Sequence, residues 1–117
     1  GNFVVTDPDF NAPGPINGVG AVFLYEPDGD LISAVRGSTL NDHVGSGGVT
    51  VVGDSNFVIE SPGWNNPSGA TALAGAVTWV NGASGLAGLV SAANSLVGTH
   101  TNDTVGTVFA LANGNPD

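Results

Sequence analysis

The chain has 117 residues, of which 41% are hydrophobic and only 9% are charged, and its formal net charge is −9. A single cation, Arg36, leaves no basic surface for nucleic acid or for an anionic membrane, and no apolar stretch is long enough to insert across a bilayer. The absence of cysteine and lysine excludes disulfides, thiolate chemistry and Schiff-base catalysis.

The first half of the chain predicts four short β-strands. Apolar runs rich in Val and Phe occur at residues 3–6, 20–25, 31–35 and 49–52, separated by Gly, Asn, Asp and Pro. The sequence Pro27-Asp28-Gly29 predicts a hairpin between the second and third runs, because Pro presets φ and Gly accepts a positive φ. No long amphipathic helix stands out, so we expect an all-β fold.

The second half predicts four more strands and repeats the first half. The strands are expected at residues 57–60, 76–80, 86–90 and 105–111, with a second hairpin turn at 81–85. Extra residues near 90–95 lengthen the second copy. Three blocks recur in the same order: residues 1–8 as 55–62 (a shift of 54), residues 20–31 as 75–86 (a shift of 55), and residues 38–46 as 99–107 (a shift of 61).

Each half has the size of one propeller blade. We therefore expect two tandem four-stranded antiparallel blade-like units, at residues 1–54 and 55–117, with residues 105–117 starting a further blade.

The motif Asn-Asp-x-Val-Gly stands at residues 41–45 and again at 102–106. Asn and Asp side chains accept hydrogen bonds from nearby backbone N–H groups, and a following Gly permits close backbone packing. The motif therefore predicts a corner that leads into a strand, not an active site.

These elements resemble the FG-GAP repeat of integrin-alpha-like β-propellers, and most of all the tandem variants in large bacterial surface proteins. Val44-Gly45 and Val105-Gly106 take the Phe-Gly position, and Asp7-Pro8 and Ser61-Pro62 take the Ala-Pro position. Residues 20–24 and 75–79 take the Gly-x-Val-Tyr position. The resemblance implies an extracellular or cell-surface protein with blade-like sheets. The Asp-x-Asp-x-Asp-Gly calcium loop of many such repeats is missing here.

The two ends of the sequence complement each other. Residues 109–115 read like the run that precedes the second Phe-Val segment, and residues 1–4 supply such a segment. A propeller needs about four or more blades, and an open sheet edge is a template for pairing. Either this sequence is part of a longer array, or copies join head to tail. The expected self-association edges are Asn2, Phe3, Val4, Val5, Phe109, Ala110 and Leu111.

Two sets of oxygen-bearing side chains at alternate positions are candidate Ca²⁺ ligands. The first set is Asp7, Asp9 and Asn11, and the second is Glu26, Asp28 and Asp30. The alternatives are an Asx-type turn for the first set and a plain hairpin tip for the second. No other cofactor is expected.

Aromatic residues divide into core and loop candidates. Phe23 and Trp79 lie in predicted strands and are expected in the core, whereas Phe10 and Trp64 lie in loops, where exposed rings are candidates for carbohydrate contact.

The sequence thus favours a non-catalytic extracellular structural module that forms homo-oligomers or filaments. The alternative is an adhesive module for carbohydrate or a surface protein, with Ca²⁺ as a possible aid. We expect no enzyme, since no Gly-x-Ser-x-Gly elbow is present and two small blades hardly make a cleft.

Overall fold

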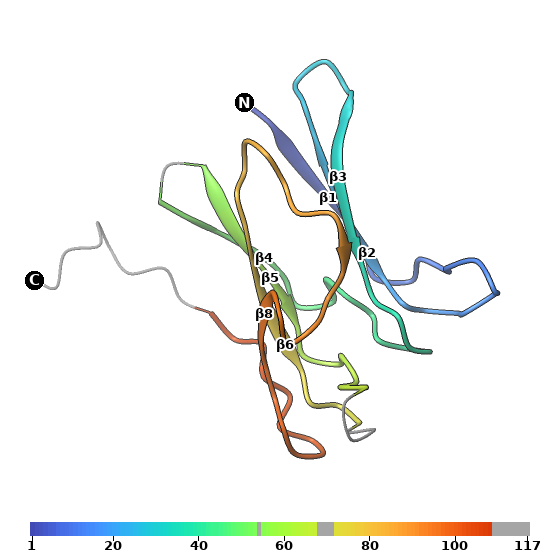
Figure 1. Ribbon diagram of the computed structural model, residues 1–117. Helices are drawn as coiled ribbons and strands as arrows, with labels where there is room; N and C mark the ends of the chain where they lie inside the picture. Colours follow the sequence, from blue (N-terminus) through green and yellow to red (C-terminus); the bar gives the residue numbers. More distant parts are fainter. Residues whose placement is uncertain (54, 68–71, 109–117) are drawn as a thin grey trace, which may run out of the picture.

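The protein is all-β. The computed structural model describes residues 1–53, 55–67 and 72–108, and every regular element in these ranges is a strand (Figure 1). The all-β prediction is thus confirmed. Within the same ranges, no helix meets the length and apolarity that crossing a bilayer demands. The strands are β1 (Phe3–Asp7), β2 (Ala21–Tyr25), β3 (Leu31–Arg36), β4 (Gly48–Val52), β5 (Asn56–Ser61), β6 (Ala76–Val80), β7 (Gly88–Leu89) and β8 (Ser95–Val97).

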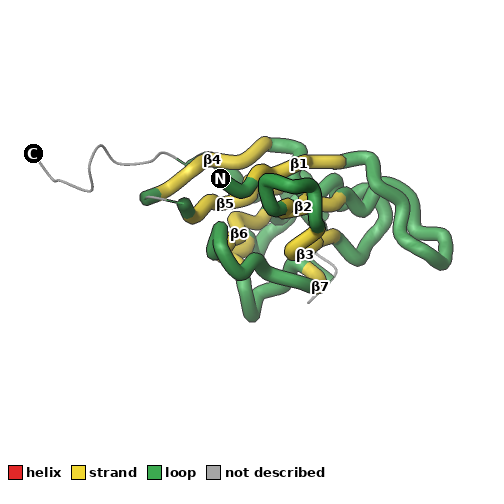
Figure 2. Tube along the Cα trace, turned by 90° about the horizontal axis from the view of Figure 1, so that it is seen from above, coloured by secondary structure: helices red, strands yellow, loops and turns green. Residues whose placement is uncertain are grey.

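The strands form two four-stranded sheets, with the orders β1-β2-β3-β7 and β4-β5-β6-β8. Neighbouring strands are antiparallel except for β3 and β7, which are parallel. Seen from above, β1, β2, β3 and β7 follow one another in one row, and β4, β5 and β6 lie in the row beside it (Figure 2). The two sheets therefore lie next to each other, with β1 and β4 at the same side of the molecule.

The two sheets repeat each other in register. Ala21 pairs with Arg36 in the first sheet, and Ala76 pairs with Val97 in the second. These positions are related by the sequence shifts of 55 and 61, so β2 corresponds to β6 and β3 corresponds to β8. The β1–β2 and β5–β6 pairs match in the same way, with β1 corresponding to β5 at a shift of 54.

The extra residues of the second half build a bridge between the sheets. The prediction that residues 86–90 pair with β6 is wrong, because β8 pairs with β6 instead. Relative to the first half, β8 lies six residues further along the chain than the predicted strand, which is the difference between the shifts of 61 and 55. The predicted turn at 81–85 forms, but it makes no hairpin. After it the chain crosses to the first sheet, where the Leu86 N–H donates to Ser33 Oγ at 3.2 Å. There β7 pairs with β3. By contrast, the predicted hairpin around Gly29 (φ 95°) is confirmed.

The expected grouping of residues 49–52 with the first sheet is wrong. They form most of β4, which pairs with β5 in the second sheet, because the short link between β4 and β5 turns the chain back on itself. Of the strand expected at 105–111, residues 105–108 form no regular strand: Val105 makes a parallel bridge to Gly75, and the Val108 N–H donates to Glu60 Oε2 at 3.2 Å. Residues 109–111 lie outside the described residues. The repeat limits of 1–54 and 55–117 stay a prediction.

The hydrophobic core lies between the two sheets. Alternate residues of β2, such as Val22 and Leu24, face alternate residues of β5, such as Phe57 and Ile59. All four side chains are at most 4% exposed. Burying a side chain of this size contributes about 1.5–3 kcal/mol, so the sheet-to-sheet contact stabilises the pair of units.

Candidate functional site

A buried carboxylate joins the first unit to the second. Asp42 is fully buried, and its Oδ2 accepts hydrogen bonds from the N–H groups of Ser38 and Thr39 at 2.9 and 2.8 Å. Its Oδ1 accepts two more from Asn65 of the second unit, from the backbone N–H at 2.9 Å and from Nδ2 at 3.0 Å. One side chain thus caps its own loop and binds the neighbouring unit.

The second copy of the motif makes only half of these bonds. Asp103 Oδ2 accepts hydrogen bonds from the N–H groups of Thr99 and His100 at 3.1 and 2.9 Å. The bond from the His100 N–H, followed by that from Thr99, lowers the pKa of Asp103. Among the described residues nothing donates to Asp103 Oδ1, and the side chain is 37% exposed. The carboxylate therefore keeps one free acceptor.

The backbone of the motif is the same in both copies. Asn41 and Asn102 have φ values of 63° and 68°, which Asn tolerates better than most residues. In each copy the motif's Val forms a parallel bridge to a Gly that precedes a strand, Val44 to Gly20 and Val105 to Gly75. These contacts confirm that the motif is a structural corner capped by its Asp.

The apolar contact between the sheets uses one face of each. The first sheet contributes alternate residues of β1, β2 and β3, and the second contributes the opposite set of alternate positions from β5 and β6. The residues on the first side are Val4, Val22, Leu24 and Val35, and those on the second side are Phe57, Ile59, Ala76, Thr78 and Val80.

The remaining face of the second sheet repeats the first of these two sides. Its residues are Val58, Val77, Trp79 and Leu96, which we call the tail face. They correspond in turn to Val4, Val22, Leu24 and Val35 of the first sheet, at shifts of 54, 55, 55 and 61. Two of them are large and open to solvent, with Trp79 51% exposed and Leu96 75% exposed. Their counterparts in the first sheet, Leu24 and Val35, are each 2% exposed.

The remaining face of the first sheet repeats the second side. Its residues at the same shifts are Phe3, Val5, Ala21, Phe23 and Tyr25, which we call the head face. The Phe3 and Tyr25 rings stack with centroids 5.2 Å apart, and Phe3 is 45% exposed. Phe10 lies edge-on against Phe23 at 5.9 Å and is half-buried. By repeat position, the tail face and the head face therefore correspond to the two sides of the contact between the sheets.

The outer edge of β1 is also open. Among the described residues no strand pairs with it, whereas its counterpart β5 is covered by β4. Beside it lies a groove of about 550 Å³, which we call the edge groove. Side chains from both sheets line it, among them Val4, Leu24, Val49, Val51 and Phe57. The expected edge residues Asn2, Phe3, Val4 and Val5 lie at this edge, while Phe109, Ala110 and Leu111 lie outside the described residues.

The two tryptophans exchange their expected places. Trp64 is fully buried and belongs to the core cluster that residues of both sheets form, and its N–H donates to the Ser61 carbonyl at 3.1 Å. Its indole N–H has no hydrogen-bond partner among the described residues. The expectation of an exposed, sugar-stacking Trp64 is therefore wrong, as is that of a core position for Trp79.

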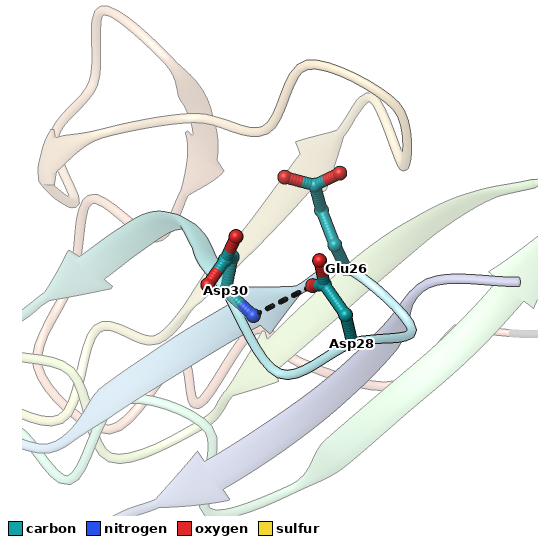
Figure 3. Close-up of side chains that lie close together, drawn as sticks. All are labelled: Glu26, Asp28 and Asp30. Atoms are coloured by element: carbon teal, nitrogen blue, oxygen red, sulfur yellow. Dashed lines mark hydrogen bonds between the residues drawn. The ribbon is translucent and has the colours of Figure 1, made fainter.

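The three carboxylates at the tip of the β2–β3 hairpin lie close together (Figure 3). Oxygen atoms of Glu26, Asp28 and Asp30 lie within 4.8 Å of one another, and all three residues are exposed. The Asp30 N–H donates to Asp28 Oδ1 at 3.0 Å, as in a hairpin tip. Calcium binding at this tip stays a prediction.

The other candidate calcium set does not gather in the same way. Asp7 and Asp9 belong to no comparable cluster of acidic and histidine side chains within the described part of the chain. Asp9 lies 3.6 Å from Nδ1 of His43, and Asn11 Oδ1 accepts the Gly18 N–H at 2.8 Å. The Phe10 N–H donates to the Asp7 carbonyl at 3.1 Å, which closes a turn at this loop.

Comparison with known families matches residues 51–107 to the model of a repeat of unknown function, DUF5650. The matched segment runs from within β4 through β8 to the second Asn-Asp-x-Val-Gly motif. Comparisons with curated proteins and with solved structures give no match.

Proposed function

We propose that this protein is a non-catalytic structural module of the cell surface or extracellular space that associates with further copies of itself head to tail. The observation that carries the proposal is the repeat relation between the open faces and the internal contact. The tail face of one copy would pack on the head face of the next, as the first sheet packs on the second within the chain.

Burial of the open side chains supplies the driving force. Trp79 and Leu96 on the tail face, and Phe3 and Val5 on the head face, are each more than 40% exposed. Covering a large apolar side chain contributes about 1.5–3 kcal/mol. Contacts of this heterologous type close into a ring or continue as a filament, depending on the rotation between copies.

Strand addition at β1 would extend the same contact. Residues 109–113 correspond in sequence to β4 at a shift of 61, and they lie outside the described residues. In the β4–β5 pair, Thr50 lies opposite Val58. In the same register, Leu111 of one copy would lie opposite Val4 of the next, beside the edge groove. The proposed edge therefore combines β1 of one copy with Phe109, Ala110 and Leu111 of another.

Sedimentation velocity over a range of concentrations, with electron microscopy of the same samples, tests this function. We expect wild-type assemblies that grow with concentration. The substitution Leu96→Asp places a charge on the tail face, at its edge strand β8, and should raise the concentration needed for assembly at least about tenfold. Leu40→Asp is the matched control, because Leu40 is 56% exposed and lies on neither face.

A wild-type protein that stays monomeric at about millimolar concentration would contradict the proposal. Equal effects of Leu96→Asp and Leu40→Asp would show that assembly does not use the tail face. The FG-GAP resemblance is independent of this test and stays a prediction.

A second candidate function is adhesion to carbohydrate, and the aromatic head face favours it. Stacked or tilted rings of Phe3, Phe23 and Tyr25 offer a platform of the kind that sugars stack on. A glycan array probed with the Leu96→Asp variant tests this, because that variant leaves the head face free. Binding that Tyr25→Ala abolishes would support adhesion, and the absence of any binding would contradict it.

A further inference from the structure

We propose that Asp103 of one copy accepts two hydrogen bonds from Asn11 of the next copy, and that this polar contact fixes the register of the assembly. The inference rests on the proposed function, since it requires a second copy at the head face. It follows from a contact that the molecule makes once internally, between Asp42 and Asn65.

On the donor side of the internal contact, the side-chain amide of Asn65 holds its own loop in place. Asn65 Oδ1 accepts the Leu73 N–H at 3.0 Å, which fixes the side chain so that Nδ2 and the backbone N–H both reach Asp42. Asn11 occupies the same place one repeat earlier, at a shift of 54. Its Oδ1 accepts the Gly18 N–H at 2.8 Å, so the amide is fixed by an equivalent bond.

The donor groups of Asn11 are the counterparts of those that Asn65 uses. Within the described part of the chain, neither its backbone N–H nor its Nδ2 donates a hydrogen bond, and the residue is exposed. Asn65, whose donors are both used, is partly buried. The head of the molecule therefore presents two oriented N–H donors that have no partner among the described residues.

The tail of the molecule presents the matching acceptor. Asp103 stands one repeat after Asp42, at a shift of 61, and its Oδ2 caps the loop in the same way. Its Oδ1 is the atom that corresponds to the acceptor of the Asn65 donors. Two N–H groups that converge on one carboxylate oxygen make a charge-assisted contact, which is stronger than a neutral hydrogen bond and adds selectivity to the contact between the apolar faces.

Two isosteric substitutions separate this contact from the fold. Asn11→Asp keeps the oxygen that holds the Gly18 N–H, but it replaces the Nδ2 donor by an anionic oxygen that repels Asp103. Asp103→Asn keeps an oxygen for the loop cap, but it turns an N–H donor toward the two donors of Asn11. Asn17→Asp is the matched control for charge, because Asn17 is exposed in the same loop and its side chain makes no hydrogen bond in the described residues.

Sedimentation velocity of the full chain measures the effect, with circular dichroism to verify that each variant folds. Each of the two substitutions should weaken association at least about thirtyfold, as expected for one partner of a charged hydrogen-bonded pair. Asn17→Asp should associate like the wild type.

Mixing the two variants gives the sharpest result. Asn11→Asp protein retains an intact tail, and Asp103→Asn protein retains an intact head. An equimolar mixture should therefore form heterodimers with one native contact and no longer species, at concentrations where each variant alone is monomeric.

The outcomes separate this inference from the proposed function. If the wild type assembles and both variants assemble equally well, the Asp103–Asn11 contact is wrong, while head-to-tail association stands. If the variants are impaired but their mixture forms no heterodimer, the inferred pairing of tail with head is overturned. If the wild type never assembles, both proposals fail.

Discussion

Removing the buried carboxylate of Asp42 should destabilise the protein far more than removing its repeat counterpart Asp103. Asp42 accepts four hydrogen bonds, two within its loop and two from Asn65 in the second unit. A hydrogen bond to a charged group contributes about 1.5–3 kcal/mol, and donors near the surface recover part of this from water. We therefore expect Asp42→Ala to lower the free energy of unfolding by about 4 kcal/mol.

Among the described residues, the matched substitution Asp103→Ala removes two exposed hydrogen bonds, both within the loop of Asp103 itself. Its effect on stability should be clearly smaller. Urea unfolding measures both, followed by the fluorescence of the buried Trp64 at concentrations where the chain is monomeric. Equal losses for the two variants, or a loss below about 1 kcal/mol for Asp42→Ala, would refute the assignment of Asp42 as the joint between the units.

Three further predictions concern stability and pH. Gly20→Ala should lower the free energy of unfolding by about 3 kcal/mol or more, because φ is 76° and an added Cβ overlaps the backbone of Val44. Gly29→Ala should lower it by only about 1 kcal/mol, because a Cβ there meets open space. Urea unfolding of both variants measures the difference. Trp64→Phe should change the free energy of unfolding by less than about 1.5 kcal/mol in the same assay, because it removes an unpaired buried N–H along with part of the ring. The pKa of Asp103 is lowered by backbone hydrogen bonds, so its ionised form stabilises the loop above the ordinary pKa of Asp, and this stabilisation is lost as the pH falls through the lowered value. An NMR titration of the loop amides should follow that loss, and an ordinary or raised pKa for Asp103 would contradict it.

The repeat relation was readable from the sequence because it is carried by residues with strong backbone requirements. Gly20 and Gly75 both need a positive φ beside a closely approaching chain, and Asp42 and Asp103 both cap a loop. Such positions tolerate few residue types, so they look alike in both copies. The all-β class and the hairpin at Gly29 followed from the same kind of local rule.

The position of the third strand in the second unit was not readable in this way. Residues 86–90 are as apolar as β8, and local propensity does not decide which run pairs with β6. Long-range contacts with the first sheet hold this segment there, namely the bond from the Leu86 N–H to Ser33 and the pairing of β7 with β3. A contact across 53 residues leaves no local signature.

The exchange of the two tryptophans has a related cause. A sheet that packs on both sides is apolar on both faces, so alternation shows which residues share a face but not which face is covered. Trp79 follows the alternation of β6 and lies on the uncovered side. Trp64 lies outside any strand, so no alternation indicates its burial, yet its ring belongs to the core cluster formed by residues of both sheets. Under the proposed assembly, the exposed Trp79 marks the face that a second copy would cover.

The most direct test of the central claim is the solvent accessibility of Trp79 in assembled protein. In a Trp64→Phe background Trp79 is the single tryptophan, and it starts 51% exposed. If copies associate as the internal sheets do, its emission should shift to shorter wavelength and its quenching by acrylamide should fall in step with the formation of assemblies, since its counterpart Leu24 is 2% exposed. Assemblies in which Trp79 remains as open to acrylamide as in the monomer would contradict the account.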